Sequence, residues 1–331
     1  MRSRAIHVIL MLLLFSPGLL HAATSEETAK SYFEEGMELN KLQRYDEAIR
    51  KLTQAVQLNL ESHKYHQALF MIHMTTRQGL KAIGVYQGMV REHPGSPAVH
   101  YWLGRLYLQS QSFDDAIREF REATRIAPND EHAWISLGHV YYRQGKDHEA
   151  MKAYQEANRL SPHAAVVHAG LGTLYLKKKD NAKARKELEE ALRIDSSLTE
   201  ARYNLSLIYD KAGETTQAAK EWERILEEDP NEWGARERLA RFYFKKGRYA
   251  EAVREFSTLS QVRLNSAEIH LALGESQILL AASLTDADER AHSTSAAVEA
   301  FQRVLELDPK NADAKAYLDR LKTQKSSEEK K

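Results

Sequence analysis

The sequence contains no cysteine in its 331 residues, which excludes disulfide bonds, thiolate metal sites, a cysteine nucleophile and the lipidated cysteine of a bacterial lipoprotein. It also has no excess of one charge, because 47 lysines and arginines balance 47 aspartates and glutamates. A nucleic-acid-binding chain usually has a basic excess, so no nucleic-acid partner is expected. Glycine and proline are both scarce, with 15 and 7 residues, and most of the chain is therefore expected to be ordered helix.

The few prolines stand at a fixed interval. Pro94, Pro128 and Pro162 are 34 residues apart, and Pro230 lies two further steps of 34 along the chain. Proline cannot continue a helix, because it lacks the backbone N–H and its ring clashes with the preceding turn. Helices that end at a fixed interval indicate a solenoid of stacked repeats. Solenoids usually present surfaces, whereas most enzymes build a single pocket.

Other residue types follow the same period. With repeats that start at residues 29, 63, 97, 131, 165, 199, 233 and 267, seven consecutive repeats align without a gap. The eighth position is mostly small, the twentieth is alanine and the twenty-fourth is mostly aromatic. Apolar residues recur at helical spacing, so each repeat is expected to form two amphipathic helices, and the small residues let the two backbones approach closely. The turn between the helices carries Gly145, Gly213 and Gly247, which suit a helix C-cap.

The fourth repeat carries the pattern most completely, in Trp134, Leu137, Gly138, Tyr141, Ala150, Tyr154, Ala157 and Pro162. On these residues, and on seven repeats in register, the chain resembles the tetratricopeptide repeat family over about residues 29 to 311. The resemblance implies an all-α fold, a right-handed superhelical solenoid of tetratricopeptide helix hairpins with a C-terminal capping helix. One departure is Phe70, which stands where the family has a small residue.

The resemblance also implies a domain plan. Eight tetratricopeptide repeats are expected over residues 24–311, the last with an insertion of 11 residues within 281–295 that extends its helices or forms a long turn. Residues 312–323 are predicted to form the capping helix, because a solenoid must cover its last apolar face. Residues 324–331 are predicted to be a charged tail.

The first 23 residues have the three-part plan of a secretory signal peptide. Arg2 and Arg4 precede an apolar run from Ala5 to Phe15, and Ala22 and Ala23 supply small residues for cleavage. The run is about half as long as a membrane-spanning helix requires, so the alternative is an uncleaved N-terminal anchor. The prediction is an exported protein in a bacterial periplasm, with extracellular release as the other possibility. Contact with a membrane is expected only through partners or through such an anchor.

In this family the first helices of the repeats line a concave groove, which implies where a partner would bind. The candidate partner-binding residues are Met71, Met74, Tyr101, Trp102, Arg105, Leu108, Ile135, His139 and Tyr142. Tryptophan, tyrosine and arginine are the usual anchors of protein interfaces, and methionine adds an adaptable surface. The hypothesis is that these residues bind an apolar helix or an extended peptide. The alternative is that they only pack on neighbouring helices.

Several other kinds of chemistry have no motif here. The family's clamp for a C-terminal carboxylate is missing, because no three consecutive repeats carry its lysine, asparagine and arginine set. His63, His66 and His73 lie on one helical face but have no HExxH motif or completing carboxylate, and packing is the expected role of the histidines. There is no GxGxxG loop. No enzyme activity, metal, cofactor or small-molecule substrate is therefore expected.

The sequence thus predicts a non-catalytic protein–protein interaction scaffold of the cell envelope, which binds a peptide or helix of a partner in its groove. One alternative is a structural subunit of an envelope complex for secretion, pilus assembly or polysaccharide export. The other is a periplasmic chaperone for apolar segments.

Overall fold

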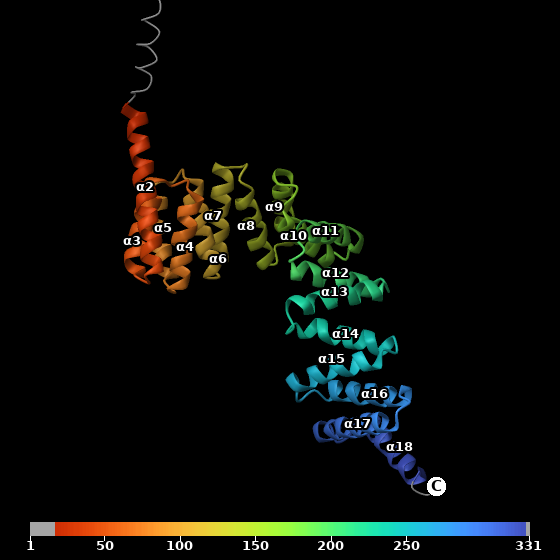
Figure 1. Cartoon of the computed structure of the whole chain (residues 1–331). Coiled ribbons are helices and arrows are strands. Elements are labelled where there is room, and N and C mark those ends of the chain that lie inside the picture. The colour runs from red at the N-terminus through yellow and green to blue at the C-terminus, as the bar shows by residue number, and fades with distance from the viewer. Residues whose placement is uncertain (1–16, 329–331) are drawn as a thin grey trace, which may run out of the picture. The chain divides into compact units, whose positions relative to one another are not determined.

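The computed structural model describes the backbone of residues 17–328 and the side chains of residues 25–323, and every regular element in that range is an α-helix (Figure 1). The helices are α2 (Pro17–Lys41), α3 (Tyr45–Leu58), α4 (His63–Thr75), α5 (Gly79–Glu92), α6 (Pro97–Gln109), α7 (Phe113–Ile126), α8 (Glu131–Arg143), α9 (Asp147–Leu160), α10 (Ala165–Lys177), α11 (Asn181–Ile194), α12 (Thr199–Lys211), α13 (Thr215–Glu228), α14 (Trp233–Lys245), α15 (Tyr249–Val262), α16 (Ala267–Ser283), α17 (Ala287–Leu307) and α18 (Ala312–Glu328). The predicted all-α solenoid of helix hairpins is confirmed.

The predicted signal peptide lies mostly outside the described residues. Residues 1–16 are not described, and residues 17–23 belong to α2, without a description of their side chains. We call the two helices of each repeat its first and second helix. The first helices of the second to eighth repeats begin at the residues where the sequence places those repeats, and they are α4, α6, α8, α10, α12, α14 and α16. The first repeat starts inside α2. Within the described range, no helix has the length and apolar character needed to span a bilayer.

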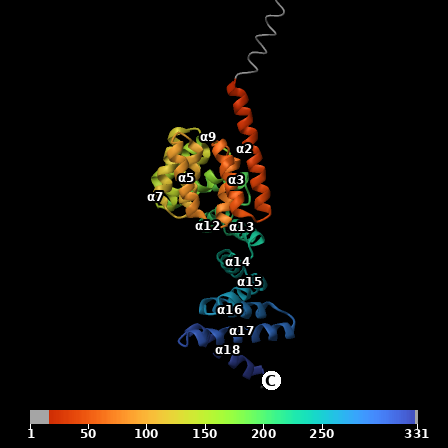
Figure 2. The ribbon, with the colours of Figure 1, turned by 90° about the vertical axis from the view of Figure 1, so that its left-hand side faces the viewer.

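The chain divides into two compact parts, one ending at Leu174 and the other beginning at Tyr175. In the N-terminal part, the first helices α2, α4, α6 and α8 contact one another in order, and each also contacts the second helix of its own repeat. In the C-terminal part, helices α14 to α18 stack in chain order, each on the next (Figure 2). Each part therefore buries its core between consecutive hairpins rather than around one centre.

The small residues at the eighth position allow the close approach that the sequence predicts. A Cβ atom on Gly104 would lie 2.8 Å from the ring of Phe120, and a Cβ atom on Gly138 would lie 2.9 Å from the ring of Tyr154. These aromatic rings come from the twenty-fourth position of the same repeats and are buried. Glycine is needed here because a larger side chain would overlap the ring that fills the hairpin.

The turn inside each of the first seven hairpins uses a left-handed residue at one repeat position. Gly145, Gly213 and Gly247 have φ values of 73°, 78° and 72°, which confirms their predicted C-cap role. The equivalent residues of four other repeats also have positive φ although they are not glycine: Gln43, Arg77, Gln111 and Lys179. These four turns therefore carry backbone strain that glycine would avoid.

The fourth position of seven repeats carries an N–H donor that ties the repeat to the loop before it. The side chain bonds to the backbone carbonyl six residues earlier, as His66 does to Leu60 over 2.8 Å and Arg236 does to Pro230 over 2.7 Å. The same contact is made by His100, Trp134, His168, Arg202 and His270. Sequence analysis predicts only packing for these histidines. The structure adds a hydrogen bond that satisfies a carbonyl beyond the end of the preceding helix.

The insertion in the last repeat lengthens both of its helices. Helix α16 has 17 residues, whereas the preceding first helix α14 has 13, and α17 has 21 residues, whereas the preceding second helix α15 has 14. The carboxylate of Asp286 caps α17 by accepting from the backbone N–H groups of Asp288 and Glu289. The sequence leaves open extended helices or a long turn, and the structure has extended helices.

The predicted capping helix is α18, which covers the last hairpin. Tyr317 stacks on Phe301 with ring centroids 4.7 Å apart and an interplanar angle of 2°. Ala314 and Phe301 are buried in the same cluster. Helix α18 ends at Glu328, so it runs five residues beyond the predicted end at residue 323. Lysine, glutamine and glutamate in this stretch are good helix formers, which accounts for the extension.

Candidate functional site

The candidate binding residues lie on the first helices α4, α6 and α8 of the N-terminal part. Because α4 contacts α6 and α6 contacts α8, residues that are 34 apart occupy neighbouring places on this surface. We call this surface the N-terminal groove, after the concave face that the family resemblance predicts here. Its ninth-position row is Met71, Arg105 and His139, and its twelfth-position row is Met74, Leu108 and Tyr142.

These residues differ in accessibility. Met71 is 55% exposed, and His139 is also exposed. The half-buried residues are Met74, Arg105, Leu108, Ile135 and Tyr142. The groove therefore presents accessible apolar side chains across three helices.

Tyr101 and Trp102, two of the candidate partner-binding residues, are buried rather than exposed on this surface. They are 6% and 3% exposed, and they belong to the core of the N-terminal part. The centroid of the Trp102 ring lies 6.0 Å from that of His66, on which it stacks, and 5.6 Å from that of Phe70. Phe70 is the large residue at a position that is small elsewhere, and its ring gives Trp102 an interior partner. For these two residues the alternative, packing on neighbouring helices, describes the structure.

Arg105 lies against this aromatic cluster. Its guanidinium carbon is 5.1 Å from the ring centre of Phe70, 5.2 Å from that of Trp102 and 5.9 Å from that of Tyr101. Its Nη1 donates a hydrogen bond of 3.2 Å to the Tyr101 hydroxyl. These contacts orient the charged group by cation–π attraction. Among the described residues no carboxylate pairs with it.

Two histidines at the edge of the cluster were not in the predicted site. The His63 ring lies 5.4 Å from that of Tyr101 and 5.9 Å from that of Trp102. It also lies 5.8 Å from the ring of His132, which comes from α8. Their positions in the sequence could have indicated them, because His63 begins α4 and His132 is the second residue of α8, and these two helices are the first helices of the repeats before and after that of α6.

Two histidines at the fourth position, His66 and His100, have pKa values that are shifted in opposite directions. Burial lowers the pKa of His66 to about 4, although its bond to the Leu60 carbonyl opposes this. Its Nδ1 faces the Tyr86 hydroxyl at 2.8 Å, which can donate to a neutral ring. Burial also lowers the pKa of His100, but the hydrogen bonds to Glu119 and to the Pro94 carbonyl outweigh it and leave that pKa raised.

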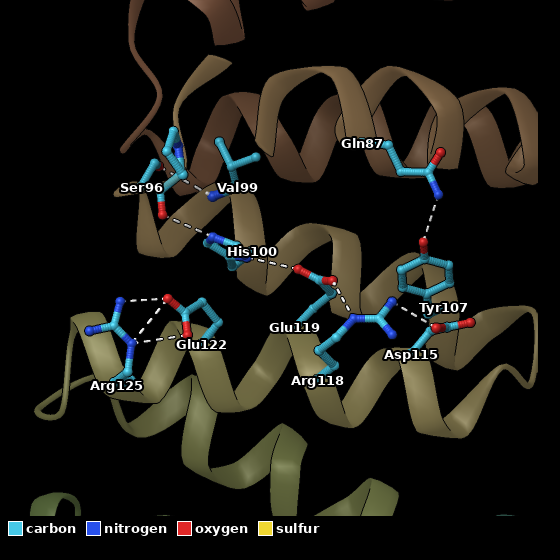
Figure 3. Close-up of polar contacts among 11 residues, drawn as sticks. Gln87, Ser96, Val99, His100, Tyr107, Asp115, Arg118, Glu119, Glu122 and Arg125 are labelled. Carbon is cyan, nitrogen blue, oxygen red and sulfur yellow. Dashed lines mark hydrogen bonds and ion pairs between the residues drawn. The ribbon is translucent and has the colours of Figure 1, made fainter. Parts of the chain in front are cut away.

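Figure 3 shows how His100 is held. One ring nitrogen faces the Glu119 carboxylate at 2.7 Å and the other faces the Pro94 carbonyl at 3.1 Å. Both partners are acceptors, so both ring nitrogens must donate, which only the protonated imidazolium can do. Glu119 also contacts Arg118 at 3.3 Å, and the carboxylate therefore lies between two cations.

The histidines form no recognisable metal site in the part of the chain that the structure describes. No three side chains of histidine, aspartate or glutamate come together there. His66 is occupied by hydrogen bonds to Leu60 and Tyr86. His73 is buried, and neither of its ring nitrogens has a hydrogen-bond partner. Burial, with a smaller contribution from Lys81, lowers its pKa.

The first helices of the C-terminal part have a different charge pattern. Arg238 pairs with Asp210 at 3.3 Å. Arg241 pairs with Glu237 at 3.0 Å and with Glu268 at 2.6 Å. The arginines on these helices are thus neutralised by neighbouring carboxylates, unlike Arg105.

Solved structures with this fold come from several systems. The C-terminal part of a tetratricopeptide repeat-containing protein from Cytophaga hutchinsonii has a TM-score of 0.55 at 19% identity, covering 77% of this chain and 98% of that one. PilF of Pseudomonas aeruginosa has a TM-score of 0.50 at 19% identity, covering 68% and 97%. The APC/C Cut9–Hcn1 hetero-tetramer has a TM-score of 0.51 at 16% identity, covering 87% of this chain and 54% of that one. The chain thus spans about half the length of that last relative. At these identities the likeness concerns the fold alone.

No curated protein sequence matches this chain. A family model does match: the Cilia and flagella-associated protein 70 C-terminal domain, a tetratricopeptide repeat domain, aligns with residues 42–268. The match covers more than half of the chain and agrees with the helix hairpins described above. Tetratricopeptide repeat proteins are in general non-catalytic scaffolds for protein–protein interaction. The chain belongs to the tetratricopeptide repeat family represented by the Cilia and flagella-associated protein 70 C-terminal domain.

Proposed function

We propose that this protein is a non-catalytic scaffold that holds a segment of a partner protein in the N-terminal groove. The observation that carries the proposal is the set of large apolar side chains left exposed or half-buried on three neighbouring first helices. They are Met71, Met74, Leu108, Ile135 and Tyr142. Accessible apolar side chains gathered on one surface favour an interaction site, and methionines let such a surface adapt to its partner.

The buried aromatic side chains of Tyr101 and Trp102, which lie under this surface, also support the proposed role. Tyr101 and Trp102 are held in the core, so they make the floor of the groove rigid rather than contact a partner freely. A rigid floor lowers the entropy lost when a partner binds. Replacing Tyr101 and Trp102 together by alanine would disrupt this floor, so exposed residues are better probes of binding.

We also propose that the protein is exported and acts in the bacterial cell envelope. The support is the charged, apolar and small-residue order of residues 1–23. Fusion of the chain to alkaline phosphatase, which is active only outside the cytoplasm, tests this. Activity is expected from the full fusion and not from a fusion that starts at residue 24. Equal activity from both fusions contradicts export by this segment.

Site-specific photocrosslinking tests the groove. A benzoylphenylalanine would replace Met71 on α4 in one variant and Leu80 on α5 in another, and both would be irradiated in cells. Leu80 is the matched control, because it is apolar, 82% exposed and on the second helix of the same repeat. The crosslinked peptides would be identified by mass spectrometry.

A dedicated scaffold predicts one partner crosslinked from position 71 and not from position 80. Crosslinks from position 80 alone would overturn groove binding and favour a structural subunit held by its outer surface. Crosslinks from position 71 to many unrelated proteins would overturn a dedicated scaffold in favour of a chaperone.

A further inference from the structure

We propose that the partner segment held in the N-terminal groove is acidic, and that one aspartate or glutamate side chain of the segment binds Arg105 between apolar contacts. This inference rests on the proposed function and adds the chemical class of the partner. It joins three observations: the isolation of the Arg105 charge, the charge of the helices around it, and the apolar residues beside it.

Most N–H donors of the Arg105 guanidinium have no hydrogen-bond acceptor among the described residues. It carries five N–H groups, and the described residues give it one hydrogen bond, to the Tyr101 hydroxyl at 3.2 Å. Because Tyr101 accepts that bond, its own hydroxyl proton remains able to donate. The guanidinium is half-buried against three rings, where a charge without a counterion is costly. The planar N–H pairs of arginine match the two oxygens of a carboxylate.

The first helices that carry the N-terminal groove contain almost no negative charge. Helices α4 and α6 have no aspartate or glutamate, and α8 has only Glu131, at its first residue. Lys64 and Arg143 lie on the same helices, so the groove favours an anionic ligand. In the C-terminal part, by contrast, Arg238 and Arg241 already pair with carboxylates. Arg105 thus differs from Arg238 and Arg241 in having no carboxylate partner among the described residues.

The neighbouring residues indicate what flanks the acidic side chain. Met71 lies beside Arg105 in the ninth-position row, and Met74 and Leu108 form the twelfth-position row next to it. Packed helices lie about 9 Å apart, and a segment in the polyproline II conformation spans about that distance in three residues and returns its side chains to the same face. A segment that crosses the groove is thus expected to place an apolar residue three positions from the acidic one, over Met71.

Peptide selection tests the inference. A random library of 12-residue peptides on phage would be selected on the purified full-length protein, and on variants Arg105→Gln and Arg105→Glu. The control is Arg91→Glu, an exposed arginine on α5 outside the groove. Thermal unfolding would establish that each variant is folded. For a peptide selected on the wild type, affinity would be measured with the acidic residue intact and replaced by glutamine.

Peptides selected on the wild type and on Arg91→Glu are expected to share an acidic residue with an apolar residue three positions away. Arg105→Glu is expected to select a basic residue at the acidic position. Loss of the peptide carboxylate should weaken binding to the wild type about tenfold or more, and should have little effect on Arg105→Gln. This last comparison needs only the mild glutamine variant to fold.

Two results would overturn the inference. One is selection without acidic enrichment, and the other is an acidic residue whose loss weakens binding to wild type and Arg105→Gln equally. If such peptides still compete with photocrosslinking at position 71, the proposed function stands and only the chemistry of the partner is wrong. If the selected peptides bind without competing at position 71, the proposed groove function fails as well.

Discussion

His100 and Glu119 form a buried pair in which the imidazolium Nδ1 donates to the Glu119 Oε2 over 2.7 Å, while Nε2 donates to the Pro94 carbonyl. The pair joins the first and second helices of the third repeat, and the Pro94 bond joins both to the preceding loop. Arg202 and Glu221, also at 2.7 Å, make the equivalent pair in the sixth repeat. One repeat position thus links three segments of the chain with a single cationic side chain.

The His100–Glu119 pair makes stability depend on pH. The folded pKa of His100 is raised, so its contribution is fully present below about pH 6.5, the ordinary histidine value, and is lost as pH rises through the folded pKa. Glu119→Gln is expected to lower the free energy of unfolding by about 1–3 kcal/mol at pH 6 and by less at pH 9. Urea unfolding at both pH values measures the difference. An equal loss at pH 6 and pH 9 contradicts a charged pair.

His66 should behave in the opposite way. Its folded pKa is lowered to about 4, so the stability it contributes is present above about pH 6.5 and is lost as pH falls toward about 4. Imidazole resonances followed by NMR should show His66 titrating near pH 4 in the folded protein and His100 titrating above its ordinary range. If both histidines titrate near their ordinary value, their surroundings are not as described.

Replacement by alanine should change the stability of the protein in opposite directions at two helix glycines. On Gly104 a Cβ atom would lie 2.8 Å from the Phe120 ring, and overpacking is expected to cost about 1–3 kcal/mol. On Gly84, within α5, a Cβ atom would meet nothing within 4 Å, and alanine should stabilise the helix by about 0.5–1 kcal/mol. Thermal unfolding of Gly104→Ala and Gly84→Ala makes the comparison. A stable Gly104→Ala would mean that the register of the third repeat is wrong.

The turn position offers a stabilising replacement. Arg77 has φ 55° in the second repeat, where the fourth repeat has Gly145 at φ 73°. Arg77→Gly should remove left-handed strain of about 1–2 kcal/mol, partly offset by the greater freedom of glycine in the unfolded chain, for a net gain of about 0.5–1 kcal/mol. The matched control Gly145→Ala should lose stability. Chemical unfolding of both variants tests this, and a gain in Gly145→Ala would contradict the shared turn conformation.

Removal of the capping helix should promote association. Without residues 312–331, the Phe301 ring loses its stacking partner Tyr317 and the last hairpin exposes its apolar face. Sedimentation of the truncated chain is expected to reveal association at concentrations where the full chain shows less. The control ends at residue 323, keeps Tyr317 and should sediment like the full chain. A soluble, monomeric truncation at residue 311 would show that α18 is not required as a cap.

Much of the fold follows from local spacing in the sequence. The 34-residue period places helix ends, the glycine at the eighth position and the left-handed turn residue. Each of these depends on contacts within one hairpin, such as that of Gly104 with Phe120. Sequence could therefore predict the hairpins, the capping helix and the helices that carry the candidate site. It could not predict that α18 continues to Glu328, because the lysine, glutamine and glutamate residues that favour a helix are also typical of a charged tail.

The character of the site depends on side-chain contacts that the repeat period does not specify, both within a hairpin and between hairpins. His66 and His100 share a repeat position, yet one faces a tyrosine hydroxyl and the other a carboxylate, and these partners set opposite protonation states. The 34-residue period marks Tyr101 and Trp102 as groove residues. It cannot reveal that Trp102 packs against Phe70 in the core. By itself, the sequence determined the repeat and the helix faces, since these arise from backbone geometry and local spacing. Only the tertiary structure decided burial, pairing and the isolation of Arg105, because these depend on which side chains the packed helices bring together, within a repeat and between repeats.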